Sequence, residues 1–275
     1  SKAVLDRMKA DLIDPDLGVP IFAVGKTNPE YFRVHAEVRE KLRRLLGVPD
    51  DYEVLIIPAS ASNVLYEQVP RNLLGNGTGL YVNTGVWSKA AIKGAQAVAS
   101  TKPGKIQVIA SSEKDQFAYI PEVTPEMLAA YQDASYLYIV ANNTVWGTKY
   151  DLDQFLANVP DGLPVVVDAT SWIASEEMKP EWWKKIGVMI AGLQKNLGPA
   201  TGTAVVIVRK DLLGRHYADT PDISRWDVFA NTNSMYNTPP MLAAWIMNLV
   251  LDSYLEAGGL AAVEGPPSRR GLAPR

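Results

Sequence analysis

Lys195 lies in the segment 192–199, which reads GLQKNLGP and directly follows the apolar run 186–192. A lysine at the end of a strand is most often a solvated surface residue, so its position alone supports no chemistry. The glycines on both sides permit a tight turn and let a ligand approach the backbone. A lysine held in a cofactor pocket loses its proton more readily and can form a Schiff base with an aldehyde. Lys195 is therefore a candidate nucleophile.

Asp168 closes the apolar run 164–168, which predicts a strand with a carboxylate at its carboxyl end. Ligands of open α/β sheets bind there, although a helix cap or a turn aspartate is the more ordinary interpretation. Pyridoxal 5′-phosphate (PLP) needs an amine for its aldehyde and a carboxylate facing its ring nitrogen. That carboxylate keeps the nitrogen protonated, so that the ring can accept electrons. Neighbouring strands ending in Asp168 and Lys195 could supply both groups.

Two further segments join a predicted strand to a predicted helix. Trp87 stands at a helix start, where its ring could stack on a flat cofactor or simply pack in the core. Ser62 and Asn63, in the segment SASN, could offer backbone N–H groups to a phosphate. Both are also good helix caps, so this second signal is weak on its own.

Helical and strand patterns alternate along the chain. Continuous apolar strands separated by helices indicate a mostly parallel sheet covered on both faces, in an α/β domain. We expect one large domain over 1–260 and a disordered tail over 261–275, which is rich in Pro, Gly and Arg. The predicted strands are 53–58, 80–83, 106–109, 136–140, 164–168, 188–191 and 204–208, and the predicted helices are 2–12, 29–46, 62–74, 87–98 and 239–256.

The composition excludes several other classes of protein. The 275 residues are 47% hydrophobic with a net charge of −3, which is typical of a soluble globular chain. No basic block suggests nucleic-acid binding, no apolar run approaches the ~20 residues that span a bilayer, and no signal-peptide core is present. The chain has no cysteine, and its two histidines form no metal-binding spacing, so we expect no metal site. A cytoplasmic location is the default expectation.

Five segments together resemble the phosphoserine aminotransferases, in that family's order and approximate spacing. The resemblance covers about residues 3–260. It implies the large domain of a three-layer fold type I PLP-dependent transferase. The enzyme would act as a homodimer in serine biosynthesis, exchanging an amino group between glutamate and 3-phosphohydroxypyruvate. The segments are TGVWSK (84–89), NNTVWGT (142–148), AGLQKNLGPA (191–200), RKDLLG (209–214) and NSMYNTPP (233–240).

The resemblance also implies a role for individual residues. Lys195 would be the Schiff-base lysine, Asp168 the partner of the ring nitrogen, and Trp87 the residue that stacks on the ring. Asn237 and Thr238 would reach the cofactor phosphate from the other subunit, so that the homodimer shares its active sites. The remaining implied contacts to the ring hydroxyl or phosphate come from Thr144, Gln194, Ser62 and Asn63.

Other positions depart from the family pattern. The family's Ser-His-Arg aligns with residues 25–27, so Thr27 replaces an arginine that holds a substrate carboxylate in a bidentate manner. Lys26 would keep a positive charge nearby, which makes Lys26 and Thr27 the predicted substrate-binding positions. A glycine pair of the phosphate loop appears as Ser60 and Ala61. The family's opening glycine-proline loop and C-terminal small domain have no counterpart here.

These departures leave two alternatives to a functional transaminase. A truncated or engineered PLP-binding scaffold would keep the cofactor residues but show little native turnover. A plain α/β oligomerisation or binding protein would not bind PLP at all.

Overall fold

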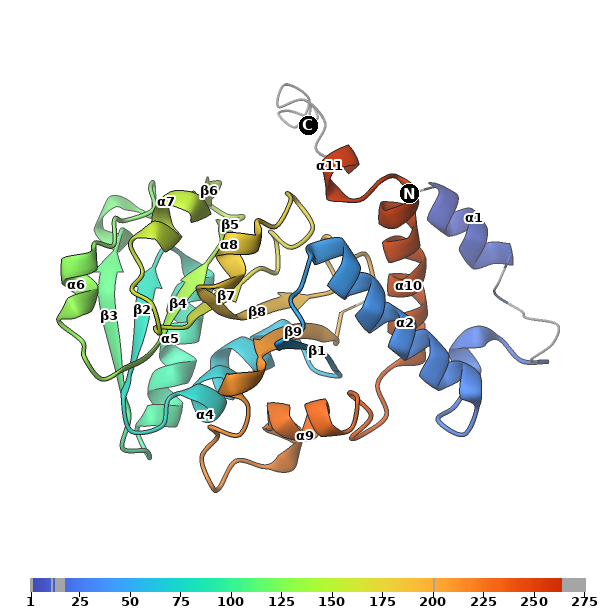
Figure 1. Cartoon of the computed structure of the whole chain (residues 1–275), viewed down its shortest axis with the longest axis horizontal. Helices are drawn as coiled ribbons and strands as arrows, with labels where there is room; N and C mark the ends of the chain where they lie inside the picture. The colour runs from blue at the N-terminus through green and yellow to red at the C-terminus, as the bar shows by residue number, and fades with distance from the viewer. Residues whose placement is uncertain (1, 11, 13–17, 200, 264–275) are drawn as a thin grey trace.

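The computed structural model describes residues 2–10, 12, 18–199 and 201–263, and its centre is a seven-stranded sheet (Figure 1). The strand order is β1-β9-β8-β7-β4-β2-β3. β9 runs antiparallel to β1 and β8, and every other neighbouring pair is parallel, which confirms the mostly parallel sheet. The strands are β1 (Tyr52–Ile57), β2 (Thr78–Asn83), β3 (Lys105–Ser111), β4 (Ala134–Val140), β7 (Val165–Asp168), β8 (Ile186–Gly192) and β9 (Ala204–Arg209).

Helices cover both faces of the sheet and complete a three-layer α/β fold. One apolar cluster includes Leu42 of α2 and Met189 of β8, and the other includes Leu65 of η2 and Val188, the residue directly before Met189 in β8. Alternate residues of one strand thus enter opposite cores. The helices are α1 (Lys2–Ala10), α2 (Pro29–Leu46), α3 (Ala61–Asn63), the π-helix η2 (Val64–Gln68), α4 (Val69–Leu73), α5 (Val86–Ala99), α6 (Pro125–Ala129), α7 (Leu152–Ala157), α8 (Pro180–Trp183), α9 (Trp226–Asn231), α10 (Met241–Glu256) and α11 (Leu260–Val263).

Short elements connect these layers. A two-stranded antiparallel ribbon, β5 (Asn142–Asn143) with β6 (Thr148–Lys149), follows β4 at the carboxyl end of the sheet. The remaining connections include the 3-10 turns η1 (Ile21–Ala23), η3 (Glu113–Asp115), η4 (Lys210–Leu212) and η5 (Asp222–Ser224).

The predicted helix 29–46 forms with its expected bounds. The Asn28 side chain accepts a hydrogen bond from Glu30 N at 2.8 Å, and Pro29 occupies the first helical position. Gly47 ends the helix with a φ of 58°, a left-handed conformation that glycine adopts without steric cost. α10 begins at Met241, two residues later than predicted, because two prolines precede it.

The predicted helix 62–74 is helical but not uniform. α3, η2 and α4 follow one another, and the π-helical turn of η2 lies between the two α-helical pieces. A π turn of this kind is common at functional sites, because it shifts the side chains that follow it around the helix axis. Leu65 and Tyr66 lie on this turn.

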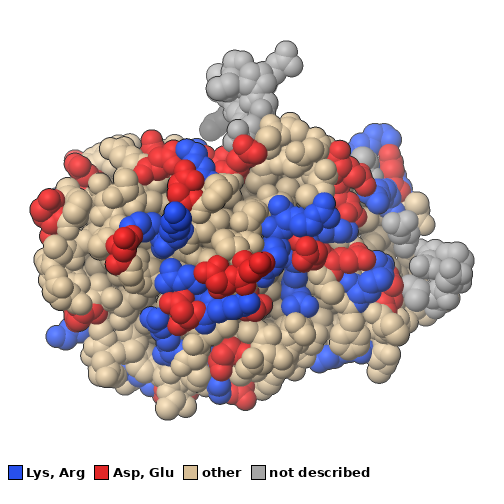
Figure 2. Space-filling view, in the orientation of Figure 1, with Lys and Arg blue, Asp and Glu red and all other residues tan. Residues whose placement is uncertain are grey.

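The chain ends differ in part from the prediction. α1 stops at Ala10 rather than at residue 12. Leu260–Val263 form a short helix, so the ordered chain extends past the expected boundary at 260, whereas 264–275 lie outside the described residues. Among the residues that the structure describes, no helix combines the length and the apolar composition needed to cross a bilayer. Figure 2 shows acidic and basic side chains interleaved on the visible face.

Gly94 lets α5 approach the π turn closely. A methyl group built on Gly94 would lie 2.6 Å from Tyr66 Cβ and 2.7 Å from the Tyr66 carbonyl oxygen. Glycine to alanine within a helix ordinarily stabilises a protein by about 1 kcal/mol. Here we expect Gly94→Ala to destabilise it by about 2 kcal/mol, because backbone would have to move.

The free energy of unfolding in urea measures this effect. Lys93→Ala, at the neighbouring exposed position of the same helix, is the control and should change stability by less than about 0.5 kcal/mol. A Gly94→Ala protein at least as stable as the wild type would contradict the close approach.

Candidate active site

Asp168 and Lys195 come together because their strands are parallel neighbours. Asp168 ends β7 and pairs in register with Ile190 of β8, and Lys195 follows the end of β8 at Gly192. A hollow of about 120 Å³ opens at this edge. Its lining residues are Ala61, Ser62, Leu65, Tyr66, Trp87, Val140, Asn142, Asp168, Thr170, Ser171, Gln194 and Lys195.

The carboxylate of Asp168 is buried but oriented by the turn that follows it. The residue is 6% exposed, and its Oδ1 accepts a hydrogen bond from Thr170 N at 3.0 Å. Burial raises the pKa of Asp168, while the hydrogen bonds from Thr170 and the charge of Lys195 oppose the rise. Thr170 Oγ1 also accepts from Gly192 N at 3.3 Å, which ties the two strand ends together. A buried carboxylate whose charge is disfavoured by its surroundings is stabilised by a ligand that brings a cationic N–H group.

The loop that carries Lys195 is anchored on both sides of the lysine. Leu193 and Leu197 are fully buried, and Asn196 Nδ2 donates to the Ile173 carbonyl at 2.7 Å. Gly198 has a φ of 82°, and its N–H donates to the Lys195 carbonyl at 3.2 Å, which closes the predicted tight turn. The lysine side chain itself is exposed. The backbone is therefore fixed while the amine stays accessible.

Trp87 provides an aromatic surface beside this amine. Lys195 Nζ lies over the indole ring, 6.0 Å from its centroid, which is the outer limit of a cation–π contact. Trp87 is the second residue of α5 and is 42% exposed, although large aromatic side chains are usually well buried. An exposed indole in a hollow is suited to stacking on a planar ring.

Two of the predicted phosphate-binding residues, Ser62 and Gln194, line the hollow. Asn63 does not. It lies on the solvent side of α3, where its N–H donates to Ser60 Oγ at 3.2 Å in a helix cap. Thr144 is exposed just after β5 and is also outside the lining. The phosphate roles of these residues stay predictions.

The other predicted residues lie outside the hollow. Asn237 and Thr238 belong to the segment before α10, and they were expected to act on a second subunit. Lys26 donates to the carbonyls of Met235 and Asn237, at 2.6 and 2.9 Å, and Thr27 is exposed. The substrate-binding role of Lys26 and Thr27 stays a prediction.

Several lining residues were missed from the sequence. Asn142 Nδ2 donates to Ser171 Oγ at 2.9 Å, and Ser171 Oγ donates back to the Asn142 carbonyl, which links the ends of β4 and β7. The strand-end position that drew attention to Asp168 applies equally to Asn142, Thr170 and Ser171. Tyr66, whose pKa is raised by burial, gave no such signal because it lies inside a helix.

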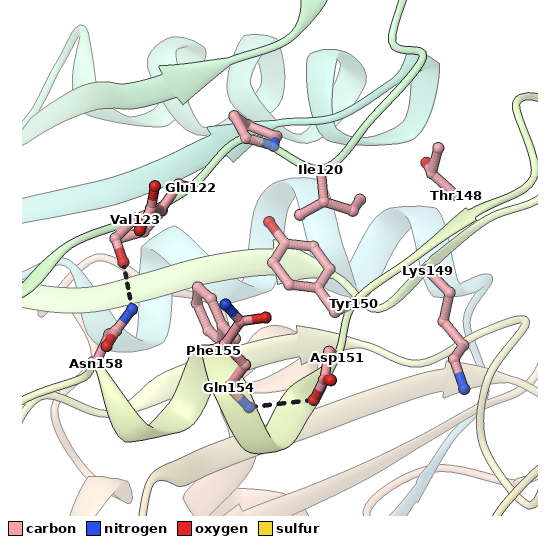
Figure 3. Close-up of a pocket in the computed structure, with 11 residues that line it drawn as sticks. Ile120, Glu122, Val123, Thr148, Lys149, Tyr150, Asp151, Gln154, Phe155 and Asn158 are labelled. Carbon is pink, nitrogen blue, oxygen red and sulfur yellow. Dashed lines mark hydrogen bonds between the residues drawn. The ribbon is translucent and has the colours of Figure 1, made fainter.

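A larger hollow of about 480 Å³ lies elsewhere, between the segment 120–123 and α7 (Figure 3). Tyr150 and Phe155 form its apolar wall. Two of its polar pairs are internal: Asp151 accepts from Gln154 N, and Asn158 Nδ2 donates to the Val123 carbonyl. The buried Tyr150 hydroxyl has no hydrogen-bond partner among the described residues. None of the predicted site residues lines it. The smaller hollow, which holds both the amine and the buried carboxylate, is therefore the candidate active site.

Comparison with known proteins identifies the family of the chain. Residues 2–266 match the family model for aminotransferase class-V. Phosphoserine aminotransferases from Desulfatibacillum aliphaticivorans and Bacillus subtilis are 40% and 36% identical to the chain, and each alignment covers 95% of the chain and 68% of the relative. The solved phosphoserine aminotransferase of Bacillus circulans subsp. alkalophilus is 34% identical with a TM-score of 0.82, covering 94% of this chain and 68% of that one.

The three-layer sheet fold and the family match define a PLP-dependent aminotransferase of class V. Within that class, the chain belongs to the phosphoserine aminotransferase family. It spans about two thirds of the length of these relatives.

Proposed function

We propose that the chain transfers the amino group of glutamate to 3-phosphohydroxypyruvate with PLP, as a cytoplasmic homodimer that shares its active sites. The observation that carries this proposal is the pair of adjacent strand ends that brings Lys195 and Asp168 into one hollow, beside Trp87. The relatives are phosphoserine aminotransferases, which supplies the substrate class.

The residues present fit PLP in their chemistry. A buried carboxylate with a raised pKa suits the protonated ring nitrogen, and an accessible amine suits the aldehyde. The bound cofactor supplies an electron sink for the bond that breaks at the substrate α-carbon. Asp168 would hold the ring nitrogen and keep it protonated. Trp87 would stack on the ring and exclude water from it.

Lys195 has two successive tasks. Its Nζ would hold the cofactor through the cofactor's aldehyde. As a free amine, the same Nζ would be the base that takes and moves the proton of the substrate α-carbon. The anchored loop keeps the amine within reach of both atoms. Ser62 and Gln194 bind the phosphate, joined by Asn237 and Thr238 of a second copy.

Absorption spectroscopy tests the proposal directly. Adding PLP should produce a visible band, adding glutamate should convert that band, and adding 3-phosphohydroxypyruvate should restore it. A band that glutamate leaves unchanged would instead select the scaffold with little turnover. The absence of any band would select the binding protein without a cofactor.

A further inference from the structure

Lys26 is engaged by the loop that precedes α10. Its Nζ donates to the Met235 carbonyl at 2.6 Å and to the Asn237 carbonyl at 2.9 Å. Tyr31, from α2, donates its hydroxyl to the Pro239 carbonyl. The segment 26–31 therefore holds three carbonyls at alternate positions of that loop. Because an ammonium has three donors, two of those of Lys26 are already used within the chain.

The base of the loop is fixed by other contacts. Asn233 and Ser234 have φ values of 53° and 68°, which residues other than glycine adopt only where the surroundings enforce them. Ser234 Oγ accepts from Ile56 N of the edge strand β1 at 2.9 Å, and Arg39 donates to Asn233 Oδ1 at 3.1 Å. These contacts hold the base of the loop, residues 233 and 234, against the sheet and α2. The tip, residues 235–238, is held by the two hydrogen bonds from Lys26 and by the edge-on packing of Tyr236 against Phe229, 6.0 Å between ring centroids.

The tip offers polar groups that its own subunit does not use. Asn237 Oδ1 is shielded from solvent and has no hydrogen-bond partner in the described part of the chain, and Thr238 is exposed. Neither residue lines the hollow that contains Lys195. The loop is attached to β1 at one edge of the sheet, whereas β7 and β8 are interior strands. A rigid loop with unused polar groups away from its own hollow is suited to contact a second copy.

We infer that Lys26 is a positioning residue, which holds residues 235–238 so that Asn237 and Thr238 meet the phosphate of PLP bound to a second copy. This inference rests on the proposed function. The Lys26 ammonium fixes the backbone of residues 235–238 and brings a positive charge close to the phosphate dianion. Without it, the loop would have to become ordered as the cofactor binds, and the affinity for PLP would fall.

Hydrogen exchange of the cofactor-free protein tests the positioning step. Lys26→Met should speed exchange of the Met235 amide, which donates to the Thr232 carbonyl at 2.8 Å, by about tenfold, because the loop opens more often once its carbonyl anchors are lost. Lys185→Met is the matched control, since Lys185 also donates to a backbone carbonyl, that of Val159 at 2.7 Å, far along the chain from this loop. Lys26→Arg, which keeps the charge and the donors, should restore most of the protection. Unchanged exchange in Lys26→Met would overturn the inference.

Hybrid dimers test whether Lys26 acts across the interface. In a dimer of Lys26→Met with Lys195→Ala chains, the intact Lys195 hollow is completed by an intact loop, and we expect wild-type affinity for PLP. In a dimer of wild type with the doubly substituted chain, the intact hollow meets the altered loop, and we expect about tenfold weaker binding. Equal affinity for PLP in both hybrids would overturn the inference about Lys26 but would not affect the proposed function. A wild-type dimer that fails to form or to bind PLP would overturn the proposed function as well.

Discussion

Lys195→Ala is expected to abolish covalent attachment of PLP and to lower turnover by about a thousandfold or more. Lys195 is the only lysine among the described residues that line the hollow, so no other amine there can take its place. Borohydride reduction of the PLP-treated protein, followed by a peptide mass map, measures the attachment. The wild type should carry the label at Lys195, and the variant should carry none.

Lys89→Ala is the control for this experiment. Lys89 lies two residues from Trp87 on α5, but its amine is paired with Glu113 at 2.5 Å outside the hollow. Its removal should leave the label and the visible band unchanged. Stoichiometric labelling of a lysine other than Lys195 in the wild type would refute the central assignment.

The sheet could be predicted from sequence because each interior strand is a short, continuous apolar run between polar turns. β7 and β8 are buried at every position, so nothing in their sequence had to alternate. The direction of β9 could not be predicted from its sequence, because a continuous apolar run does not indicate whether the strand pairs in a parallel or an antiparallel manner. Its antiparallel pairing follows from the short connection after β8, which has no room for a crossover helix.

The chemical centre could also be predicted, but its surroundings could not. Asp168 and Lys195 follow strand ends, and parallel neighbours bring such ends together by topology alone. Tyr66 lines the same hollow from the π turn of η2, and no local propensity encodes that turn. Lys26 was expected to serve the substrate, yet its contacts are made with residues more than two hundred positions away. Such a contact depends on the whole fold.

Asp168→Asn is expected to lower turnover by about a thousandfold while it stabilises the cofactor-free protein by about 1 kcal/mol. Asparagine keeps the Oδ1 that accepts from Thr170 N, so the turn should be preserved. It cannot hold the ring nitrogen protonated, and the electron sink is weakened. It also removes a charge that burial disfavours.

The pH dependence of this stabilisation has a definite sign. Burial raises the pKa of Asp168 in the folded state, so the folded protein binds the proton more tightly than the unfolded chain does. The contribution of Asp168 to stability is therefore fully present below the unfolded pKa of about 3.9, and it is lost as the pH rises through the folded value. The stability gap between Asp168→Asn and the wild type should widen as the pH increases from about 4.

Urea unfolding of both cofactor-free proteins across this pH range measures the gap. Asp211→Asn is a control of opposite sign, because the hydrogen bond from Arg209 lowers the pKa of Asp211. The stability that Asp211 provides is present above its unfolded pKa, so that variant should become the less stable protein as the pH rises. A gap for Asp168→Asn that stays constant or narrows with pH would mean that the carboxylate is not held in an environment that disfavours its charge. In that case the Asp168 carboxylate would gain no stabilisation by pairing with the protonated ring nitrogen, and its burial would not favour the binding of PLP.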